Sequence, residues 1–326
     1  MSSTPDRSEQ LNRTETPPVY SGGVSLQLTP QQHARLAWKY QARRWMVGYA
    51  FIAPILFFFG LFMIVPILWV VFGSFQQGGI ITPSEFVGPD NWRSVFGDEL
   101  VRTTVKNTGY FTLLAIPGVI VAGLVLALAL LRVQKGEAVF RAGIFFPVLA
   151  PPVIGALMFL FVLHPDFGAV TLAMRTVGLS SPSWLGDPAY ALPTVAAFEI
   201  WRGAGFYALV FLAGLLALPK ELYQAAALDG ANTLRRFWHV TLPLLKPTAQ
   251  FVLVMATVWN LQLFDSVFVL TDGGPVNRTV TVVMYVYRSL FAFGNVGFGY
   301  ALSMVLLLVI LAVSLVQFRL LRSRNR

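Results

Sequence analysis

Six long apolar segments restrict the fold of this chain more than any other feature of its sequence. They lie near residues 47–73, 109–131, 143–163, 191–216, 248–270 and 300–318. The hydrocarbon core of a bilayer is about 30 Å thick, so a helix needs about 20 mostly apolar residues to cross it. Prolines inside such helices are tolerated when neighbouring groups satisfy the freed carbonyls. The sequence therefore predicts an all-α polytopic membrane protein with about six transmembrane helices.

The composition supports an integral membrane protein. Of the 326 residues, 56% are hydrophobic and 12% are charged, which is about half the charged fraction of an ordinary soluble domain. A soluble enzyme of this length would have no way to cover so much apolar surface. The chain has no cysteine, which excludes a disulfide framework, a thiolate zinc site and a cysteine nucleophile.

The distribution of Lys and Arg predicts how the chain is oriented. With the N-terminus inside, the inside segments 1–46, 132–142, 217–247 and 319–326 hold 17 of these residues, and the outside segments hold 6. Cytoplasmic loops of membrane proteins carry such an excess of basic residues. We therefore expect both termini in the cytoplasm. The formal net charge of +9 is attributed to this orientation and not to a nucleic-acid partner.

Three parts are expected along the chain. Residues 1–45 are interpreted as a polar cytoplasmic tail that ends in a basic, aromatic stretch, either an interfacial helix or a simple flank of the first span. Residues 46–320 form the transmembrane domain, and residues 321–326 form an arginine-rich cytoplasmic tail at the membrane edge. Residues 279–293 are apolar but short and contain Arg288, so we expect an interfacial or re-entrant helix there and not a seventh span.

The segment 219–247 combines helix-forming and turn-forming residues on the expected cytoplasmic side. Glu221 suits the first turn of a helix, three consecutive alanines favour its continuation, and Gly230 permits a tight bend. An apolar surface that includes Phe237 follows, and Pro243 is expected to break the helical pattern. The sequence thus predicts two short helices with a tight bend, a shape that suits docking into a groove on a partner.

This segment resembles the EAA loop of ABC importer permeases. That loop has the pattern E-A-A, three residues, Gly and a later hydrophobic-x-Leu-Pro, present here as Gln224-Ala225-Ala226, Gly230 and Val240-Thr241-Leu242-Pro243. In the family the loop forms the coupling helix that sits in a cleft of the ATPase subunit. The resemblance implies coupling to an ATPase by Glu221, Gln224, Ala225, Ala226, Asp229, Gly230, Arg235 and Phe237. Gln224 replaces the family's Glu, so an amide hydrogen bond is expected there, or else Glu221, one helical turn earlier, supplies the charge.

Three further strings resemble signatures of the carbohydrate-uptake branch of this family, which includes maltose, trehalose and glycerol-phosphate permeases. They are Phe86-Val87-Gly88-Pro89-Asp90-Asn91-Trp92, Trp184-Leu185-Gly186-Asp187-Pro188 and Thr271-Asp272-Gly273-Gly274-Pro275. The resemblance covers roughly residues 45–320 and implies an ABC type I importer permease fold in the bacterial cytoplasmic (inner) membrane. It also implies uptake of a mono-, di- or oligosaccharide, with a glycerol phosphate or another polyol derivative as the alternative.

The same resemblance implies several partners, which carry the ATP chemistry. They are a second and usually different permease subunit, two ATPase subunits and an extracytoplasmic solute-binding protein. ATP and Mg would bind to the ATPases, and we expect this chain to bind no cofactor or metal and to be no enzyme. The phosphate-binding string G-x-x-x-x-G-K-[ST] is absent, and His33, His164 and His239 show no metal-ligand spacing.

Polar and aromatic residues inside the fourth and fifth apolar segments predict a solute path. They are Glu199, Trp201, Arg202, Trp259, Asn260, Gln262 and Asp265. Polar groups in a bilayer usually face a cavity or a partner, and a sugar needs neutral hydrogen-bonding groups beside an aromatic face. Asn260 and Gln262 lie about 200° apart on an ideal helix, so they line one pocket only if it is wide or the helix is irregular. Otherwise they would form hydrogen bonds between helices.

Two charged residues in the fourth segment leave alternatives open. Glu199 and Arg202 are three residues apart and can pair on one helix face, as a structural ion pair or within an anion site for a phosphorylated solute. An ion-coupled secondary transporter, a different class of protein, would use carboxylates such as Glu199 and Asp265 in broken helices. Dependence of uptake on ATP distinguishes the two classes. A membrane-embedded enzyme has no support, since no nucleophile, base and orienting group come together in the sequence.

Overall fold

The computed structural model describes residues 30–79 and 84–322, with side chains placed for 45–79 and 84–320. The expected polar tail before residue 30, the side chains of the basic stretch that follows it, and the last four residues lie outside this description. The chain divides into two compact units, Met1–Val65 and Pro66–Arg326. In the first unit, α1 (Pro30–Phe59) is one continuous helix with Pro54 inside it, and the π-helical turn η2 (Gly60–Ile64) follows.

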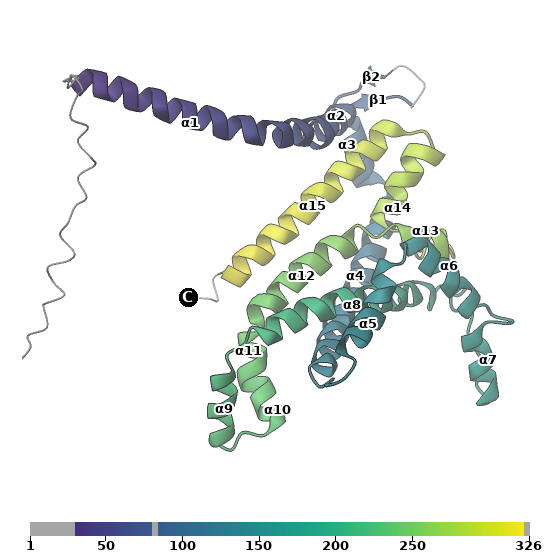
Figure 1. Ribbon diagram of the computed structural model, residues 1–326. Helices are drawn as coiled ribbons and strands as arrows, with labels where there is room; N and C mark the ends of the chain where they lie inside the picture. Colours follow the sequence, from purple (N-terminus) through teal and green to yellow (C-terminus); the bar gives the residue numbers. More distant parts are fainter. Residues whose placement is uncertain (1–29, 80–83, 323–326) are drawn as a thin grey trace, which may run out of the picture. The chain divides into compact units, whose positions relative to one another are not determined.

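The second unit contains most of the secondary structure. Its elements are α2 (Val65–Gly73, which begins at the boundary), β1 (Gln76–Gln77), β2 (Glu85–Phe86), α3 (Asp90–Gly97), α4 (Glu99–Leu130), α5 (Glu137–Leu149), α6 (Pro152–Val162), α7 (Ala169–Thr176), α8 (Ala191–Leu216), α9 (Lys220–Leu228), α10 (Thr233–Arg236), η3 (Phe237–Thr241), α11 (Leu242–Leu244), α12 (Lys246–Leu261), α13 (Asp265–Leu270), α14 (Val282–Tyr287), η4 (Arg288–Ala292) and α15 (Val296–Arg322). Within this unit α9 and α10 lie at one end, and β1, β2, α3 and α14 lie at the other (Figure 1).

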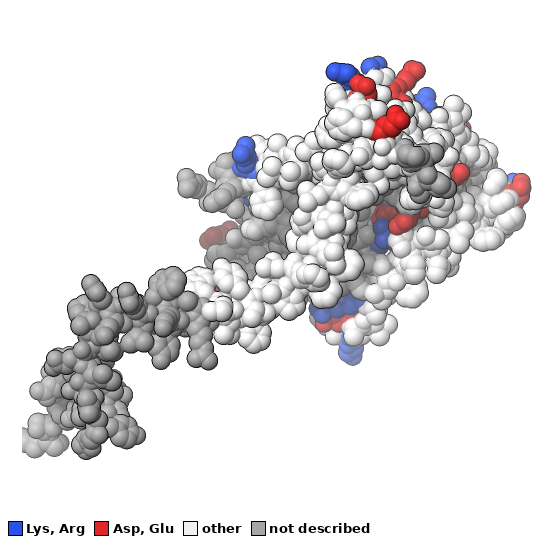
Figure 2. Space-filling view, turned by 90° about the horizontal axis from the view of Figure 1, so that it is seen from above, with Lys and Arg blue, Asp and Glu red and all other residues white. Residues whose placement is uncertain are grey.

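The prediction of about six spans agrees with the lengths of the helices. Among the described residues, four helices are long and apolar enough to cross a membrane: Trp45–Gly73, Glu99–Leu130, Ala191–Leu216 and Val296–Leu320. Two bent helix pairs raise the number to as many as six if each pair is one span. The apolar helix Val282–Ala292 is shorter, as expected for residues 279–293. Figure 2 shows a face that is mostly uncharged, with the charged residues gathered in a few groups.

The prediction of one helix over residues 143–163 is wrong. α5 and α6 meet at an angle of 95°. Ala150 (ψ 135°) and Pro151 (ψ 134°) are extended between them. Each of these two residues precedes a proline, and the proline ring disfavours the helical conformation of the residue before it.

The prediction of one helix over residues 248–270 is also wrong. α12 ends at Leu261 and α13 begins at Asp265, so three residues near the end of the predicted span are not helical. At its other end, α12 is bent by 65° against the helical stretch Thr233–Leu244. The break there falls at Leu245 and not at Pro243 as predicted, because the proline lies directly after the π-helical turn η3, and such a turn accommodates it within the helical stretch.

Close packing of α4 against α8 forms the centre of the second unit. A Cβ atom on Gly123 would lie 2.8 Å from Cβ of Tyr207 and 3.2 Å from the backbone nitrogen of Ala208. Small residues allow such close approach between membrane helices, where dispersion contacts replace the hydrophobic effect as the attraction. Elsewhere on these two helices, the aromatic rings of Phe111 on α4 and Phe198 on α8 are fully buried in a separate core cluster. α8 is therefore held firmly along its length, and it carries a third of the residues that line the site described below.

The string at residues 86–92 has a structural role at the end opposite α9. Asn91 Nδ2 donates hydrogen bonds to the carbonyl oxygens of Ser74 (3.0 Å) and Gln76 (2.8 Å), and Trp92 Nε1 donates to Ser74 Oγ (3.2 Å). Gly297 at the start of α15 packs directly on the Gln76 carbonyl, so no side chain fits there. These contacts join the chain after α2 to the beginning of α15.

The string at residues 271–275 lies in a second fixed loop at the same end. Asn107 Nδ2 on α4 donates to the carbonyl oxygens of Asn277 (2.8 Å) and Val280 (2.9 Å). Thr279 Oγ1 donates to the Gly274 carbonyl (2.6 Å) inside the loop. Backbone groups in this loop are therefore satisfied by side chains, as expected where a chain leaves regular structure near a membrane.

Candidate functional site

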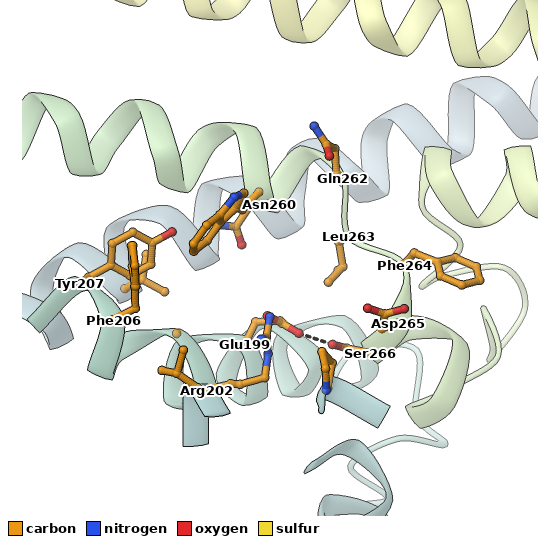
Figure 3. Close-up of a pocket in the computed structure, with 15 residues that line it drawn as sticks. Glu199, Arg202, Phe206, Tyr207, Asn260, Gln262, Leu263, Phe264, Asp265 and Ser266 are labelled. Atoms are coloured by element: carbon orange, nitrogen blue, oxygen red, sulfur yellow. Dashed lines mark hydrogen bonds and ion pairs between the residues drawn. The ribbon is translucent and has the colours of Figure 1, made fainter. Parts of the chain in front are cut away.

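A cavity of about 370 Å³ lies where the fifth predicted span is broken. Its wall is formed mainly by α8, α12, α13 and the residues between the last two helices (Figure 3). Six of the seven residues predicted for the solute path line it: Glu199, Arg202, Trp259, Asn260, Gln262 and Asp265. A cavity of this size is typical of a site for a small ligand.

The break in the helix falls at Gln262, which lines the cavity together with Asn260. Gln262 is the C-cap of α12 (φ −100°, ψ 18°), and the helical rotation of the chain stops there. The side chain of Leu263 points to the side of the backbone opposite Gln262 (Figure 3). Thr281 Oγ1 donates to the Leu263 carbonyl (2.8 Å) and satisfies the group that the break leaves free. The irregular helix expected as one alternative is therefore present.

Glu199 is the most connected side chain of the cavity. Its Oε2 accepts hydrogen bonds from Arg202 Nη2 (2.7 Å) and Nε (3.2 Å), so the predicted ion pair is confirmed. Its Oε1 accepts a short hydrogen bond from Ser266 Oγ on α13 (Figure 3). Because 7% of Glu199 is exposed, the charge is taken out of solvent and needs these partners. The network joins α8 to the segment beyond the helix break.

Aromatic rings form one side of the cavity. Trp259 lies 5.0 Å from Phe206 and 6.1 Å from Tyr207, measured between ring centroids. The predicted path residue Trp201 lies elsewhere, since it does not line the cavity and packs on Phe159 and Phe198 instead. Aromatic faces beside polar groups are the arrangement that binds the C–H surface of a sugar ring.

Phe206, Tyr207 and Ser266 also line the cavity, although the sequence did not lead us to predict them. Phe206 and Tyr207 follow Glu199 at helical spacings of seven and eight residues, so they lie on the same face of α8. That periodicity could have identified them. Ser266 had no comparable signal, because its contact with Glu199 depends on how the chain turns after α12.

Asn260 is buried, and the nitrogen and oxygen of its amide have different roles. Nδ2 donates to the Ala256 carbonyl within α12 (2.7 Å), which holds the side chain in one orientation. Within the described chain Oδ1 has no hydrogen-bond partner and remains an acceptor. Trp259 beside it is 49% exposed and offers a free ring face. The cavity thus presents an oriented acceptor next to an aromatic surface.

The 219–247 segment has the two short helices and the tight bend that were predicted. Gly230 adopts φ +75°, and the backbone N–H of Ala231 donates to the Ala226 carbonyl (3.0 Å) to close the end of α9. Asn232 Oδ1 then accepts from the N–H of Arg235 (2.9 Å) and caps α10. A Cβ atom on Gly230 would have no neighbouring atom within 4 Å, so the glycine is required by the turn and not by close packing.

The bend carries exposed apolar side chains at its surface. Leu228 is 90% exposed, Leu234 66% and Trp238 56%. Neither Glu221 nor Gln224 has a side-chain partner within the described residues, and both are exposed. Tyr223 Oη donates to Thr241 Oγ1 (3.0 Å) and links α9 to η3. The arrangement is an exposed helical knob with a fixed base.

These features define a class of protein: a multi-pass membrane permease with a small polar cavity at a helix break. Residues 118–326 match the family described as binding-protein-dependent transport system inner membrane component. The chain belongs to that family, so it is a transport subunit of an ABC importer in the inner membrane and not an enzyme.

The sequence similarity to other transport permeases covers most of the chain. It is 32% identical to the sulfoquinovosyl glycerol transport system permease of Agrobacterium fabrum, over 84% of this chain and 90% of the relative. It is 30% identical to the trehalose/maltose transport system permease of Thermococcus litoralis (88% and 97% covered). It is 32% identical to the sn-glycerol-3-phosphate permease of Agrobacterium fabrum (86% and 96% covered).

A solved structure has the same fold. A chain of a bacterial ABC transporter involved in the import of the acidic polysaccharide alginate superposes with a TM-score of 0.79 at 24% identity. The match covers 89% of this chain and 99% of that one. The predicted ABC type I importer permease fold is confirmed by this similarity.

Proposed function

We propose that this chain forms one half of the translocation path for a saccharide, and that its 219–247 segment transmits the motion of a partner ATPase to that path. The observation that carries the proposal is the cavity at the break between α12 and α13. Asn260, Gln262 and Trp259 all line it. Hydroxyl groups of a sugar need such hydrogen-bonding groups, and its C–H surface needs the aromatic face.

Helical segments connect the 219–247 segment to the cavity along the chain. A partner ATPase would bind the exposed knob through Glu221, Gln224, Ala225, Ala226, Asp229, Gly230, Arg235 and Phe237. From α10 the helical stretch 233–244 leads into α12, and α12 ends at the cavity. Movement of the knob would turn α12 and change which side of the membrane reaches the cavity, as alternating access requires.

The complete machine would contain other chains. We propose a second, different permease subunit, two ATPase subunits that bind ATP and Mg, and an extracytoplasmic solute-binding protein. The excess of Lys and Arg on the segments containing α9 and α10 supports a cytoplasmic knob and cytoplasmic termini. No cofactor is proposed for this chain itself.

A phosphorylated polyol is the second candidate solute. It is favoured by Arg202 in the cavity and by the name of the glycerol-phosphate relative. An ion-coupled transporter is set aside, because the family uses binding proteins and because Glu199 already pairs with Arg202.

The test is uptake of labelled sugars by the assembled complex in proteoliposomes. We expect uptake to require ATP and to survive collapse of ion gradients. Asn260→Ala and Gln262→Ala should each reduce uptake about tenfold or more by removing hydrogen-bonding groups, while the complex still assembles. Gln250→Ala is the matched control, since it removes an amide from α12 outside the cavity. Uptake driven by an ion gradient without ATP would refute the proposal, and unchanged uptake by both amide variants would remove them from the site.

A further inference from the structure

The charges that line the cavity bear on which saccharides can enter it, if the proposed function holds. Three charged residues lie in its wall: Glu199, Arg202 and Asp265. Among the described lining residues Arg202 is the single cation. Its guanidinium is turned onto Glu199 with two N–H···O contacts of 2.7 and 3.2 Å, so its charge is neutralised at hydrogen-bonding distance.

Asp265 stands apart from this pair. It is the first residue of α13, its side chain is exposed at the cavity, and no residue of the described chain bonds to its carboxylate. In Figure 3 no dashed line reaches it, whereas Glu199 is joined to the adjacent Ser266. The contribution of this chain to the cavity is therefore a neutral pair and one surplus negative charge.

An anionic solute that drew Arg202 away from Glu199 would leave this carboxylate without its cation. Glu199 is 7% exposed, and a buried carboxylate that loses its cation is strongly destabilised. The anion would also meet Asp265 in a cavity that is poorly screened by salt. Uncharged hydroxyl groups meet neither obstacle, because they can donate to the Asp265 carboxylate and to Oδ1 of Asn260.

We propose that the cavity admits uncharged saccharides and rejects anionic ones, and that Asp265 is the residue that sets this specificity. Removal of its charge should raise the affinity for an anionic saccharide, relative to the matching neutral one, by between about tenfold and about a hundredfold. This is the range expected when a like charge a few ångströms away is removed at an intermediate dielectric. The proposal excludes sulfonated and uronic acid solutes for the unmodified chain, and it decides against the phosphorylated polyol that was named above as the second candidate.

The experiment measures ligand binding to the assembled transporter in nanodiscs without its binding protein, so that the cavity alone is tested. The probes are the methyl glycosides of glucose, galactose and mannose, each paired with its uronate, observed by saturation-transfer NMR. We expect the wild-type complex to bind each neutral glycoside more tightly than its uronate. In Asp265→Asn the ratio of the two affinities should be closer to one. Asp265→Glu keeps the charge and should keep the preference. Glu85→Gln removes an exposed carboxylate on β2, away from the cavity, and should leave the ratio unchanged.

Two results would overturn the inference: a wild-type preference for the uronates, or the same ratio in Asp265→Asn as in wild type. Both leave the proposed function standing, since saccharides still bind. If neither member of any pair binds to the complex, the proposed function fails. The inference that Asp265 selects neutral over anionic saccharides then fails with it.

Discussion

Single side chains connect parts of this protein that are distant in sequence, and Glu199 is the clearest example. Its carboxylate receives Arg202 from its own helix and Ser266 from beyond the helix break. Buried polar groups are costly when they lose a partner, more than the net value of the bond itself. The stability of the helix break should therefore be sensitive to one hydroxyl group.

Replacing Ser266 by Ala should destabilise the complex by about 1–3 kcal/mol, because Oε1 of Glu199 loses its donor. The measurement is thermal unfolding of the purified complex in detergent. Ser303→Ala is the control, since Ser303 Oγ donates to the Gly299 carbonyl of its own helix, and its loss should change stability by less than about 0.5 kcal/mol. Equal unfolding temperatures for the two variants would contradict the role given to the Glu199–Ser266 bond.

Gly230 and Gly136 provide a matched pair for the coupling proposal. Both have positive φ (+75° and +72°), and neither has an atom within 4 Å of a Cβ position. A side chain at either site costs about 1–2 kcal/mol of backbone strain. We expect Gly230→Leu to insert into the membrane but to lose sugar-stimulated ATP hydrolysis and uptake, because it changes the bend that we propose as the contact with the ATPase.

Gly136→Leu carries the same strain between α4 and α5 and should retain coupled transport. ATP hydrolysis and uptake measured together in proteoliposomes separate uncoupling from loss of protein. Normal import by Gly230→Leu would show that the bend does not couple to the ATPase.

At the level of helices, the contact of α4 with α8 depends on small residues. Gly123→Ala places a methyl group 2.8 Å from Tyr207 Cβ and 3.2 Å from the backbone of Ala208, so the helices must move apart. Overpacking of this kind costs about 1–3 kcal/mol. Gly109→Ala on the same helix has no neighbour within 4 Å and should be neutral or stabilising by up to about 1 kcal/mol. Thermal unfolding that fails to rank the two variants in this order would disprove close packing at Gly123.

The helix breaks differ in how clearly the sequence indicates them. The break between α5 and α6 has a local signal in Pro151-Pro152, although prolines inside an apolar segment are also compatible with one continuous span. The break after Leu261 has no proline, and it is stabilised by Thr281, which lies 18 residues after Leu263 in the chain. Periodicity within a window of residues cannot detect a donor at that distance.

At the level of the whole molecule, orientation in the membrane is the property that the proposal most needs. The chain has no cysteine, so single cysteines can be placed without removing any. Leu228 in the bend is 90% exposed, and Val276 in the opposite loop is 86% exposed. In intact cells an impermeant maleimide should label Val276→Cys and not Leu228→Cys, which should react only after permeabilisation. The reverse labelling pattern would place the knob outside the cell and contradict ATP coupling.

Apolar segments, the excess of basic residues and the spaced E-A-A-like string are local properties, and each can be read without knowing what packs where. They sufficed for the all-α fold, the approximate number of spans and the family. Six of the seven predicted path residues also line the cavity, because polar groups are rare in apolar helices and tend to face a common space. The position of Trp201, the role of Ser266 and the shared cavity of Asn260 and Gln262 required the folded chain. Each depends on contacts between segments far apart in sequence, and such contacts form only when packing offsets the exposure of backbone groups at a break.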